Sequence, residues 1–391
     1  MRSLRPLFRH ALWAALACAA MPALPATLKA TLLTRADDPR LDRSQLERAY
    51  LGHPAGLPAD GVQLAIDEAQ FELDAAGSSV ALSNDTAASL EAARTAAQKA
   101  EKAGAAMLLV DLPTDWTVAV ARSVKLPVLN VGDASDRLRE ADCGTSLWHL
   151  LPSERMRADA LAQALTARKW SSVLLLTGPS ADDATRSAVA QAAIRRYGLK
   201  LVASKPFKLS ADPRERDLAN PLLLTGGLSY DVVWVVDSAG ELARSLPYRT
   251  ALPRPVVGDA GLVAVAWHAQ FERFGAPEVS RRFWRAAKRP MTGHDWAAWM
   301  AGKALVQAAI AQPRGPVAAW SAALAPQQLD GSKGVNLSFR AWDGQLRQPL
   351  LLTDGQGVIA TAPIEGLLHP RNVLDTLGTD APEKLCKARS P

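Results

Sequence analysis

From Leu28 onward, short runs rich in aliphatic and β-branched residues alternate with longer alanine-rich runs whose apolar residues recur at helical spacing. This alternation is typical of a parallel sheet covered by helices, because each parallel connection is long enough to hold a helix. It occurs twice, before and after Leu151-Pro152-Ser153. We therefore predict an α/β fold with two doubly wound parallel-sheet lobes and a ligand cleft between them.

The expected elements follow from the same periodicity and from turn and capping residues. In the first series, strands are expected at 29–34, 79–82, 106–110 and 127–131, and helices at 60–73, 87–103 and 115–124. In the second, helices are expected at 154–169 (capped by Ser153) and 181–197, and strands at 172–176, 200–206, 232–236 and 255–258. Beyond Gly261, helices are expected at 264–274, 280–288 and 294–311, then hairpins from 335–342, 348–353 and 357–361, which Asp-Gly pairs at 343–344 and 354–355 join.

The first 26 residues have the three parts of an export signal: basic residues at 2, 5 and 9, an uncharged apolar run, and a short Pro-Ala segment. We expect cleavage after Ala26 and a periplasmic protein without a membrane-spanning helix. About 365 remaining residues are enough for two lobes. We assign residues 27–148 plus 261–325 to lobe 1 and residues 149–260 plus 326–391 to lobe 2.

The charge and the cysteines of the processed chain narrow its partners and its compartment. Removing the signal leaves 42 basic and 39 acidic residues from the 45 and 39 of the whole chain, so nucleic acid is not an expected partner. Only Cys143 and Cys386 remain after cleavage, and thiols oxidise outside the cytoplasm. We expect them to form a disulfide, and we expect the protein to be a monomer.

Common catalytic and cofactor motifs are absent from the sequence. No glycine-rich dinucleotide loop, phosphate-binding loop, His-Glu-x-x-His motif or Gly-x-Ser-x-Gly elbow is present. None of the later histidines lies three or four residues from another: 53, 149, 268, 294 and 369. We expect no catalytic residues and no required cofactor.

Nearly every expected strand ends in an acidic loop, and in doubly wound sheets ligands bind outside the carboxyl ends of the strands. Helix capping is an alternative role for any single aspartate. The candidate ligand-binding residues are Asp37, Asp85, Asp111, Thr114, Asp115, Trp116, Asp133, Ser135, Asp182, Asp237 and Asp259. Together they favour a cationic or polyhydroxylated ligand. One version is a calcium-like or lanthanide-like ion bound by Asp111, Asp115, Asp133 and Asp136.

The whole processed chain resembles the type I periplasmic solute-binding proteins of ABC transporters, the group that includes branched-chain amino acid binders. The segments that carry this resemblance are 61–69, 160–176, 230–235 and 295–308. The resemblance implies a small solute as ligand and an inner-membrane ABC permease as partner. In amino acid binders of this group, Ser and Thr hydroxyls hold the carboxylate, whereas aspartates dominate the corresponding loops here and are expected to repel it.

Three further segments look like the subfamily associated with pyrroloquinoline-quinone-dependent alcohol dehydrogenase systems: 50–54, 337–349 and 374–378. This resemblance implies a role in periplasmic alcohol oxidation and a quinoprotein dehydrogenase as a possible partner. Three hypotheses follow from the sequence. They are a solute receptor of an ABC transporter, an enzyme using paired carboxylates such as Asp111 and Asp115, and an accessory protein of the dehydrogenase system.

Overall fold

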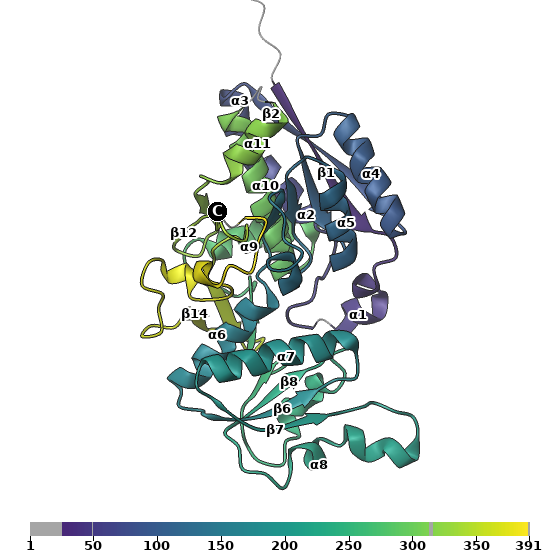
Figure 1. Cartoon of the computed structure of the whole chain (residues 1–391), viewed down its shortest axis with the longest axis vertical. Helices are drawn as coiled ribbons and strands as arrows, with labels where there is room; N and C mark the ends of the chain where they lie inside the picture. Colours follow the sequence, from purple (N-terminus) through teal and green to yellow (C-terminus); the bar gives the residue numbers. More distant parts are fainter. Residues whose placement is uncertain (1–25, 49, 313–315, 390–391) are drawn as a thin grey trace, which may run out of the picture.

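A computed structural model describes residues 26–48, 50–312 and 316–389. The expected signal peptide, residues 1–26, lies outside the described residues except for Ala26, the first residue of β1. Figure 1 shows two lobes, one above the other, with β1 in the upper lobe and β6 in the lower. In the described ranges, no helix is both long enough and apolar enough to cross a membrane.

The upper lobe is built on a five-stranded parallel sheet of order β2-β1-β3-β4-β5. Its strands are β1 (Ala26–Arg35), β2 (Ser78–Ala87), β3 (Met107–Asp111), β4 (Val128–Asn130) and β5 (Leu147–His149). Successive side chains of a strand point to opposite faces, so Leu32 packs in one core cluster and Leu33 in another. Helices therefore cover both faces.

Each face of the upper sheet has its own helices. On one face lie α2 (Ala59–Glu68), α3 (Gln70–Ala75) and α10 (Gly293–Ala311); on the other lie α4 (Leu90–Lys102) and α5 (Thr114–Ser123). A Cβ at Gly302 of α10 would lie 2.7 Å from the carbonyl oxygen of Val62, so the glycine lets α10 approach α2 closely. Helix α9 (Ala276–Ala287) also packs against α2.

The lower lobe has a four-stranded parallel sheet of order β7-β6-β8-β9. The strands are β6 (Ser172–Thr177), β7 (Lys200–Pro206), β8 (Val232–Val236) and β9 (Val256–Gly258). One face packs against α6 (Glu154–Ala167) and α7 (Ala181–Arg196), and α8 (Pro221–Thr225) lies on the other. The expected cap is confirmed, because the Ser153 hydroxyl accepts the Met156 N–H at 3.2 Å.

A small antiparallel sheet joins the two cores. It contains β10 (Val263–Val265), β13 (Leu350–Thr353) and β14 (Val358–Ala362), with the expected Asp354-Gly355 turn between β13 and β14. Val263 and Val265 of β10 pack in the core of the upper lobe, and Ala264 between them packs in that of the lower lobe. The segment 326–391, expected in the second lobe, likewise contributes side chains to both cores.

Three sequence predictions of secondary structure were wrong, and other elements were not predicted. Residues 264–274, expected as a helix, contain β10, and the expected helix 60–73 divides into α2 and α3 at Ala69. The expected strand 335–342 is reduced to β12 (Asn336–Leu337), which pairs with β11 (Leu329–Asp330). Strand β5 and helix α11 (Val317–Leu324) were not predicted.

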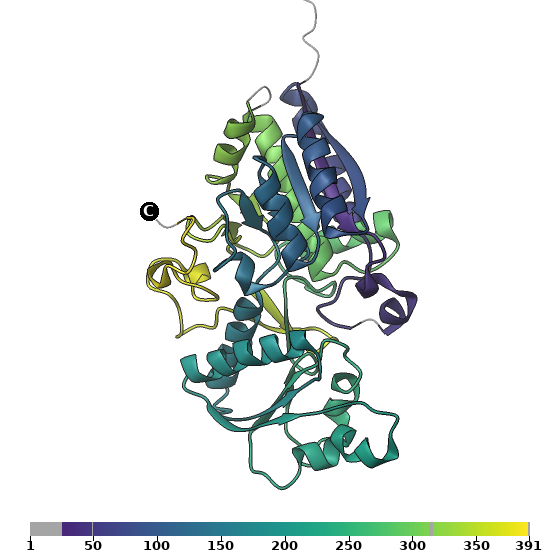
Figure 2. The ribbon, with the colours of Figure 1, turned by 45° about the vertical axis from the view of Figure 1, so that its right-hand side comes forward.

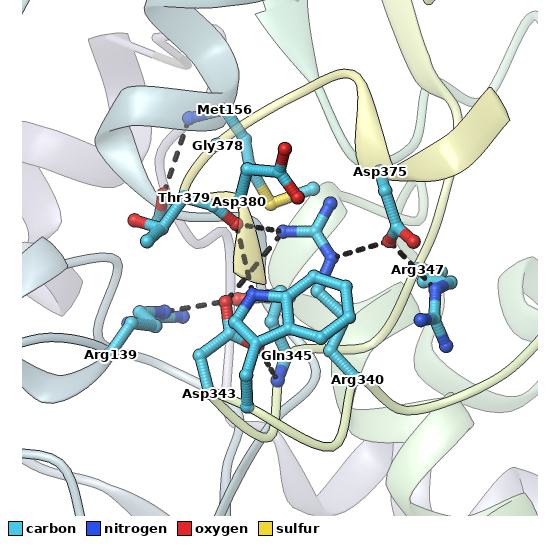
Figure 3. Close-up of polar contacts among 12 residues, drawn as sticks. Arg139, Met156, Arg340, Asp343, Gln345, Arg347, Asp375, Gly378, Thr379 and Asp380 are labelled. Carbon is cyan, nitrogen blue, oxygen red and sulfur yellow. Dashed lines mark hydrogen bonds and ion pairs between the residues drawn. The ribbon is translucent and has the colours of Figure 1, made fainter. Parts of the chain in front are cut away.

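The C-terminal tail is fastened to the body around a buried arginine, as Figure 3 shows. The Arg340 side chain is 1% exposed and donates to Asp375 Oδ1 at 3.0 Å and to the carbonyl oxygens of Leu374 and Leu377 at 2.8 Å. Further along the tail, Cys386 forms a disulfide with Cys143, with an S–S distance of 2.10 Å. The network involves the 337–349 and 374–378 segments singled out in the sequence.

Candidate functional site

A cleft with a volume of about 1290 Å³ lies between the two lobes. In the upper lobe it is lined by the loops that follow β3 and β4, and in the lower lobe by α6, α7 and the loops that follow β8 and β9. Helix α7 lies along the top of the lower lobe, facing the upper lobe (Figures 1 and 2). The strand-end position of these loops is the usual ligand site of doubly wound sheets.

The predicted ligand-binding residues divide into two sets. The residues that line the cleft are Thr114, Asp133, Ser135, Asp182 and Asp259, together with Asp136. Those not among its described lining residues are Asp37, Asp85, Asp111, Asp115, Trp116 and Asp237. Members of the second set differ from one another in burial and in bonding partners.

Asp111 lies directly behind the cleft wall. It is buried, and its Oδ1 accepts a hydrogen bond from Arg40 at 2.6 Å, while Arg40 itself lines the cleft. Burial raises the pKa of Asp111, and the positive charge of Arg40 opposes that rise. A Cβ at residue 132 would lie 1.7 Å from Asp111 Oδ1, so only glycine fits there. Asp111 therefore fixes Arg40 in the cleft wall.

Asp237 is a buried capping residue. Its carboxylate accepts the backbone N–H groups of Gly240, Leu242 and Ala243 at 2.9 to 3.0 Å, so it holds the loop after β8 in place. Burial is the main cause of the raised pKa of Asp237. Helix-type capping, the alternative role considered for these aspartates, applies at this position.

The remaining members of the set lie away from the cleft. Asp85 is inside β2, opposite Leu33 of β1, and Asp37 is exposed. Asp115 is exposed on α5 and pairs with Arg137 at 3.2 Å. Trp116 is half-buried, with the Arg35 guanidinium 5.8 Å from its ring centroid.

The predicted metal site is not formed. Within the described residues, no three or more histidine, cysteine, aspartate or glutamate side chains come together as a metal-binding group. Asp111 is bonded to Arg40 and Asp115 to Arg137, and Asp136 accepts the Arg155 N–H at 3.1 Å. Burial raises the pKa of Asp136 to about 6. A hard cation needs several carboxylate oxygens converging on one point, which these partners prevent.

The arginines of the cleft were not predicted from the sequence. Seven arginines and eight carboxylate residues line it, so the expected acidic cleft is a balanced one. The arginines are Arg35, Arg40, Arg137, Arg155, Arg157, Arg186 and Arg196. Two of these arginines could have been recognised by their spacing from an acidic residue. Arg40 follows Asp38 by two residues in the first strand-end loop, and Arg157 follows Glu154 by three residues in α6.

A chain of ion pairs crosses the lower wall of the cleft. Glu154 Oε1 lies 3.2 Å from Arg157 Nη1, its Oε2 lies 3.3 Å from Arg186 Nε, and Arg186 Nη2 lies 2.5 Å from Asp259 Oδ1. Burial alone would raise the pKa of Glu154, but Arg186 and Arg157 hold it below its ordinary value. The negative charges of Glu154 and Asp259 are thus compensated by arginines within the wall of the cleft.

A buried arginine supports the upper loop from behind. Arg139 donates to the carbonyl oxygens of Asp133, Ser135 and Leu151 at 2.8 to 3.0 Å, and its Nε donates to Gln345 Oε1 at 3.0 Å. Burial lowers the pKa of Arg139. The 337–349 segment therefore contacts the cleft indirectly, through a residue that shapes the loop between residues 132 and 136.

Two histidines complete the wall. His53 and His294 both line the cleft, and His294 is the second residue of α10. Burial lowers the pKa of His53 below its ordinary value and that of His294 well below it, with nearby arginines adding to both shifts. Both imidazoles are therefore neutral near pH 7. The sequence analysis assigned neither of them to the site.

Comparison with solved structures shows the same fold in several proteins. A periplasmic binding protein from Burkholderia mallei has 12% identity and a TM-score of 0.65, over 92% of this chain and 98% of that one. A branched-chain amino acid ABC transporter periplasmic ligand-binding protein from Burkholderia xenovorans has 14% identity and a TM-score of 0.68, over 85% and 95%. A solute-binding protein from R. palustris in complex with benzoate has 15% identity and a TM-score of 0.62, over 86% and 95%.

No protein-family model and no curated protein sequence matches the chain. The structural similarity confirms the predicted fold class, the two-lobed α/β fold of the type I periplasmic binding proteins. At 12 to 15% identity the similarity establishes the fold but does not identify the ligand.

Proposed function

We propose that this protein is the solute-binding component of an ABC transporter, which closes its lobes on a small ligand and delivers it to a permease. The observation that supports this most is the cleft of about 1290 Å³ lined by strand-end loops of one lobe and helices of the other. A cleft divided between two lobes can couple ligand binding to closure, because a ligand that contacts both lobes favours the closed state.

The charged groups of the cleft favour binding over catalysis. Arg40 is bonded to Asp111, and Arg186 is bonded to Glu154 and Asp259. A carboxylate bonded to arginine is a poor general base because the pair stabilises its ionised form. The similar structures from Burkholderia xenovorans and R. palustris are described as binding proteins of ABC transporters.

The compartment, the assembly and the partners belong to the same proposal. A disulfide between Cys143 and Cys386 is compatible with an oxidising compartment such as the periplasm. We propose a monomer that meets an inner-membrane permease. A link to quinoprotein alcohol oxidation, as receptor or accessory protein, stays a prediction from the 50–54, 337–349 and 374–378 segments.

The test is a thermal-shift screen of the purified protein against amino acids, aromatic acids, alcohols, aldehydes, quinone cofactors and metal ions. A ligand that binds only the folded protein at 100 times its Kd adds about 2.7 kcal/mol to the free energy of unfolding. We expect an organic solute to raise the melting temperature and to reduce the radius of gyration in X-ray scattering. A stabilising solute that leaves the radius unchanged, or a screen without any stabilising solute, contradicts the proposal.

A further inference from the structure

Several cleft residues carry a buried polar atom that has no hydrogen-bond partner among the described residues. These residues are Asp133, Arg155, Arg157 and His294. Buried polar atoms in proteins are nearly always hydrogen-bonded, and exceptions mark places where water or a ligand belongs. The Nε of Arg157 is a fixed donor, and Nδ1 of His294 is a donor or an acceptor depending on its protonation.

The main electrostatic influences on the pKa of His294 come from basic groups, which lower it. The groups that influence it are Arg40 of the upper lobe, Arg157 of α6, and His53. No carboxylate is among them, so a proton on His294 would be uncompensated in the present arrangement. Burial and these neighbours hold the pKa of His294 well below its ordinary value.

His53 has a mixed environment that leads to the same outcome. Asp259 favours its charged form, whereas Arg186, Arg157 and Arg40 oppose it, and burial is the largest influence of all. The pKa of His53 is lowered as a result. Asp133 Oδ1 accepts the Ser135 N–H at 2.7 Å while its Oδ2 has no partner, and Asp133 is not among the main influences on either histidine.

We propose that the cleft binds the acidic group of a small organic anion beside Arg157, His53 and His294, and that binding draws a proton onto these histidines. This inference rests on the proposed function, since it names the ligand class of the same cleft. Arg157 supplies the unpartnered Nε–H while its Nη1 remains bonded to Glu154. The anion supplies the negative charge that His294 lacks, so the imidazole gains a proton from solvent and becomes a second donor.

This assignment reverses the expectation that a free carboxylate is repelled. That expectation assumed unpaired aspartates, but Asp111 is held by Arg40 and Asp259 by Arg186. The local field at His294 comes from basic residues.

The sign of the pH dependence follows from linkage. The two histidines have lowered pKa values in the free protein, and a bound anion should raise these values. At pH values between the pKa of the free protein and that of the complex, the complex therefore holds more protons than the free protein. In that range affinity falls as pH rises, by about tenfold per pH unit for each proton taken up. A cationic ligand would draw no proton onto these histidines and would not give this fall in affinity.

The experiment is isothermal titration calorimetry of the purified protein with acetate, benzoate and succinate, and with ethanol, benzyl alcohol and benzamide as neutral counterparts. Titrations in buffers of different ionisation enthalpy measure the protons taken up per anion bound. We expect at least one acid to bind with proton uptake, and affinity to rise from pH 8 to pH 6. Imidazole signals of His53 and His294 in NMR should move to higher pKa values with the anion present.

Variants separate a direct role from a structural one. Arg157→Gln should weaken the bound anion by about tenfold to a hundredfold, and Arg157→Lys by less, because a hydrogen bond to a charged group is lost. His294→Gln should reduce proton uptake and flatten the pH profile. Matched controls are Arg168→Gln at the end of the same helix and His268→Gln, both outside the lining of the cleft, which should leave affinity and proton uptake unchanged.

The outcomes distinguish this inference from the proposed function. If a neutral solute binds and closes the lobes while none of the acids binds, the protein is a solute receptor but the anion site is overturned. Binding of an acid without proton uptake, or with affinity unaffected by Arg157→Gln, also overturns it. If nothing in the wider thermal-shift screen binds, the proposed function itself fails.

Discussion

The two flanks of the interlobe cleft are fastened in different ways. On one flank the C-terminal tail is bonded to both lobes, and on the opposite flank residues near α1 (Arg43–Arg48) reach from the upper lobe to the lower (Figures 1 and 2). We refer to residues 372–389 with their partners as the tail side. We refer to Arg48, Tyr50, Gly240 and Glu241 as the mouth side.

The tail side is held by covalent and buried contacts. Cys386 forms a disulfide with Cys143 of the upper lobe. Arg389 donates to the carbonyl oxygens of Gly144, Thr145 and Leu147, at the start of β5. On the lower lobe, Glu383 pairs with Arg155 at 2.6 Å, and the Gly378 N–H donates to Asp159 at 2.9 Å. Burial raises the pKa of Asp159 to about 6.

The mouth side is held by a partly exposed ion pair and by one contact between a ring and a glycine. Arg48 pairs with Glu241 at 3.0 Å, with the two side chains 32% and 47% exposed. The Tyr50 ring packs on Gly240, where a Cβ would lie 2.6 Å from the ring. This contrast predicts that the lobes pivot at the tail side and open at the mouth side, because a partly exposed ion pair costs less to break than a buried network.

The strongest change should come from removing the disulfide of the tail side. Cys143→Ser with Cys386→Ser should lower the free energy of unfolding by about 3 to 5 kcal/mol, because the bond closes a loop of 243 residues. Urea unfolding measures the loss. The wild-type protein in excess reductant serves as the control and should match the double variant. Equal stability of oxidised and reduced protein would show that the tail is not a fastening.

The next effect is the loss of the buried guanidinium. Arg340→Met should cost about 3 to 4 kcal/mol, since it leaves the buried Asp375 and two carbonyl oxygens short of donors. Limited proteolysis should also cut the tail faster. Arg347→Met is the matched control, because Arg347 contacts the same Asp375 but is less buried, and its loss should be smaller. Equal effects would argue against Arg340 as the centre of the network.

A weaker effect is expected at the mouth. Gly240→Ala and Gly227→Ala both place an alanine at positive φ, +69° and +73°, at a cost of about 1 to 2 kcal/mol each. Only Gly240 faces Tyr50, and nothing lies within 4 Å of a Cβ at Gly227. We therefore expect Gly240→Ala alone to widen the cleft, seen as a larger radius of gyration in X-ray scattering. If both variants have the same radius of gyration, the contact between Tyr50 and Gly240 does not help to hold the lobes together.

Arg48→Ala should have the least influence. An exposed ion pair contributes little and is screened by salt, so the open population should rise by about twofold or less, and only at low ionic strength. Single-molecule energy transfer between labels on the two lobes measures that population. Glu241→Gln should behave alike. A large rise of the open population that does not depend on salt would contradict this expectation. It would show that Arg48 holds the mouth side as strongly as the tail side is held.

The lower lobe was the most predictable part of the fold. Strands β6, β7 and β8 and helix α7 lie within one or two residues of their predicted ends. Strands β6 and β8 are buried and therefore read as continuous apolar runs. Strand β10 could not be recognised, since it is three residues long and pairs with β13, almost ninety residues later. Such a strand is specified by its partner rather than by its own pattern.

The cleft was predictable in position but not in charge. Strand order places Asp133 and Asp259 at the cleft, as the strand-end rule requires. Arg186 and Arg157 lie on helices distant from the aspartates in sequence, and only the packing of α6 and α7 brings them to the wall. The sequence therefore predicted the aspartates of the cleft but not the arginines that accompany them.

The packing of α10 against α2 also sets the order in which the chain can mature. The strands of the lower sheet come from residues 172–258, one continuous stretch, but the core beneath them also takes Leu350, Leu352 and Leu377 from the end of the chain. The upper sheet waits for α10, whose residues emerge from the ribosome more than two hundred positions after α2. Both cores therefore stay incomplete until the last sixty residues of the chain are available, and a chain that ends before β13 should leave apolar surface exposed on both lobes.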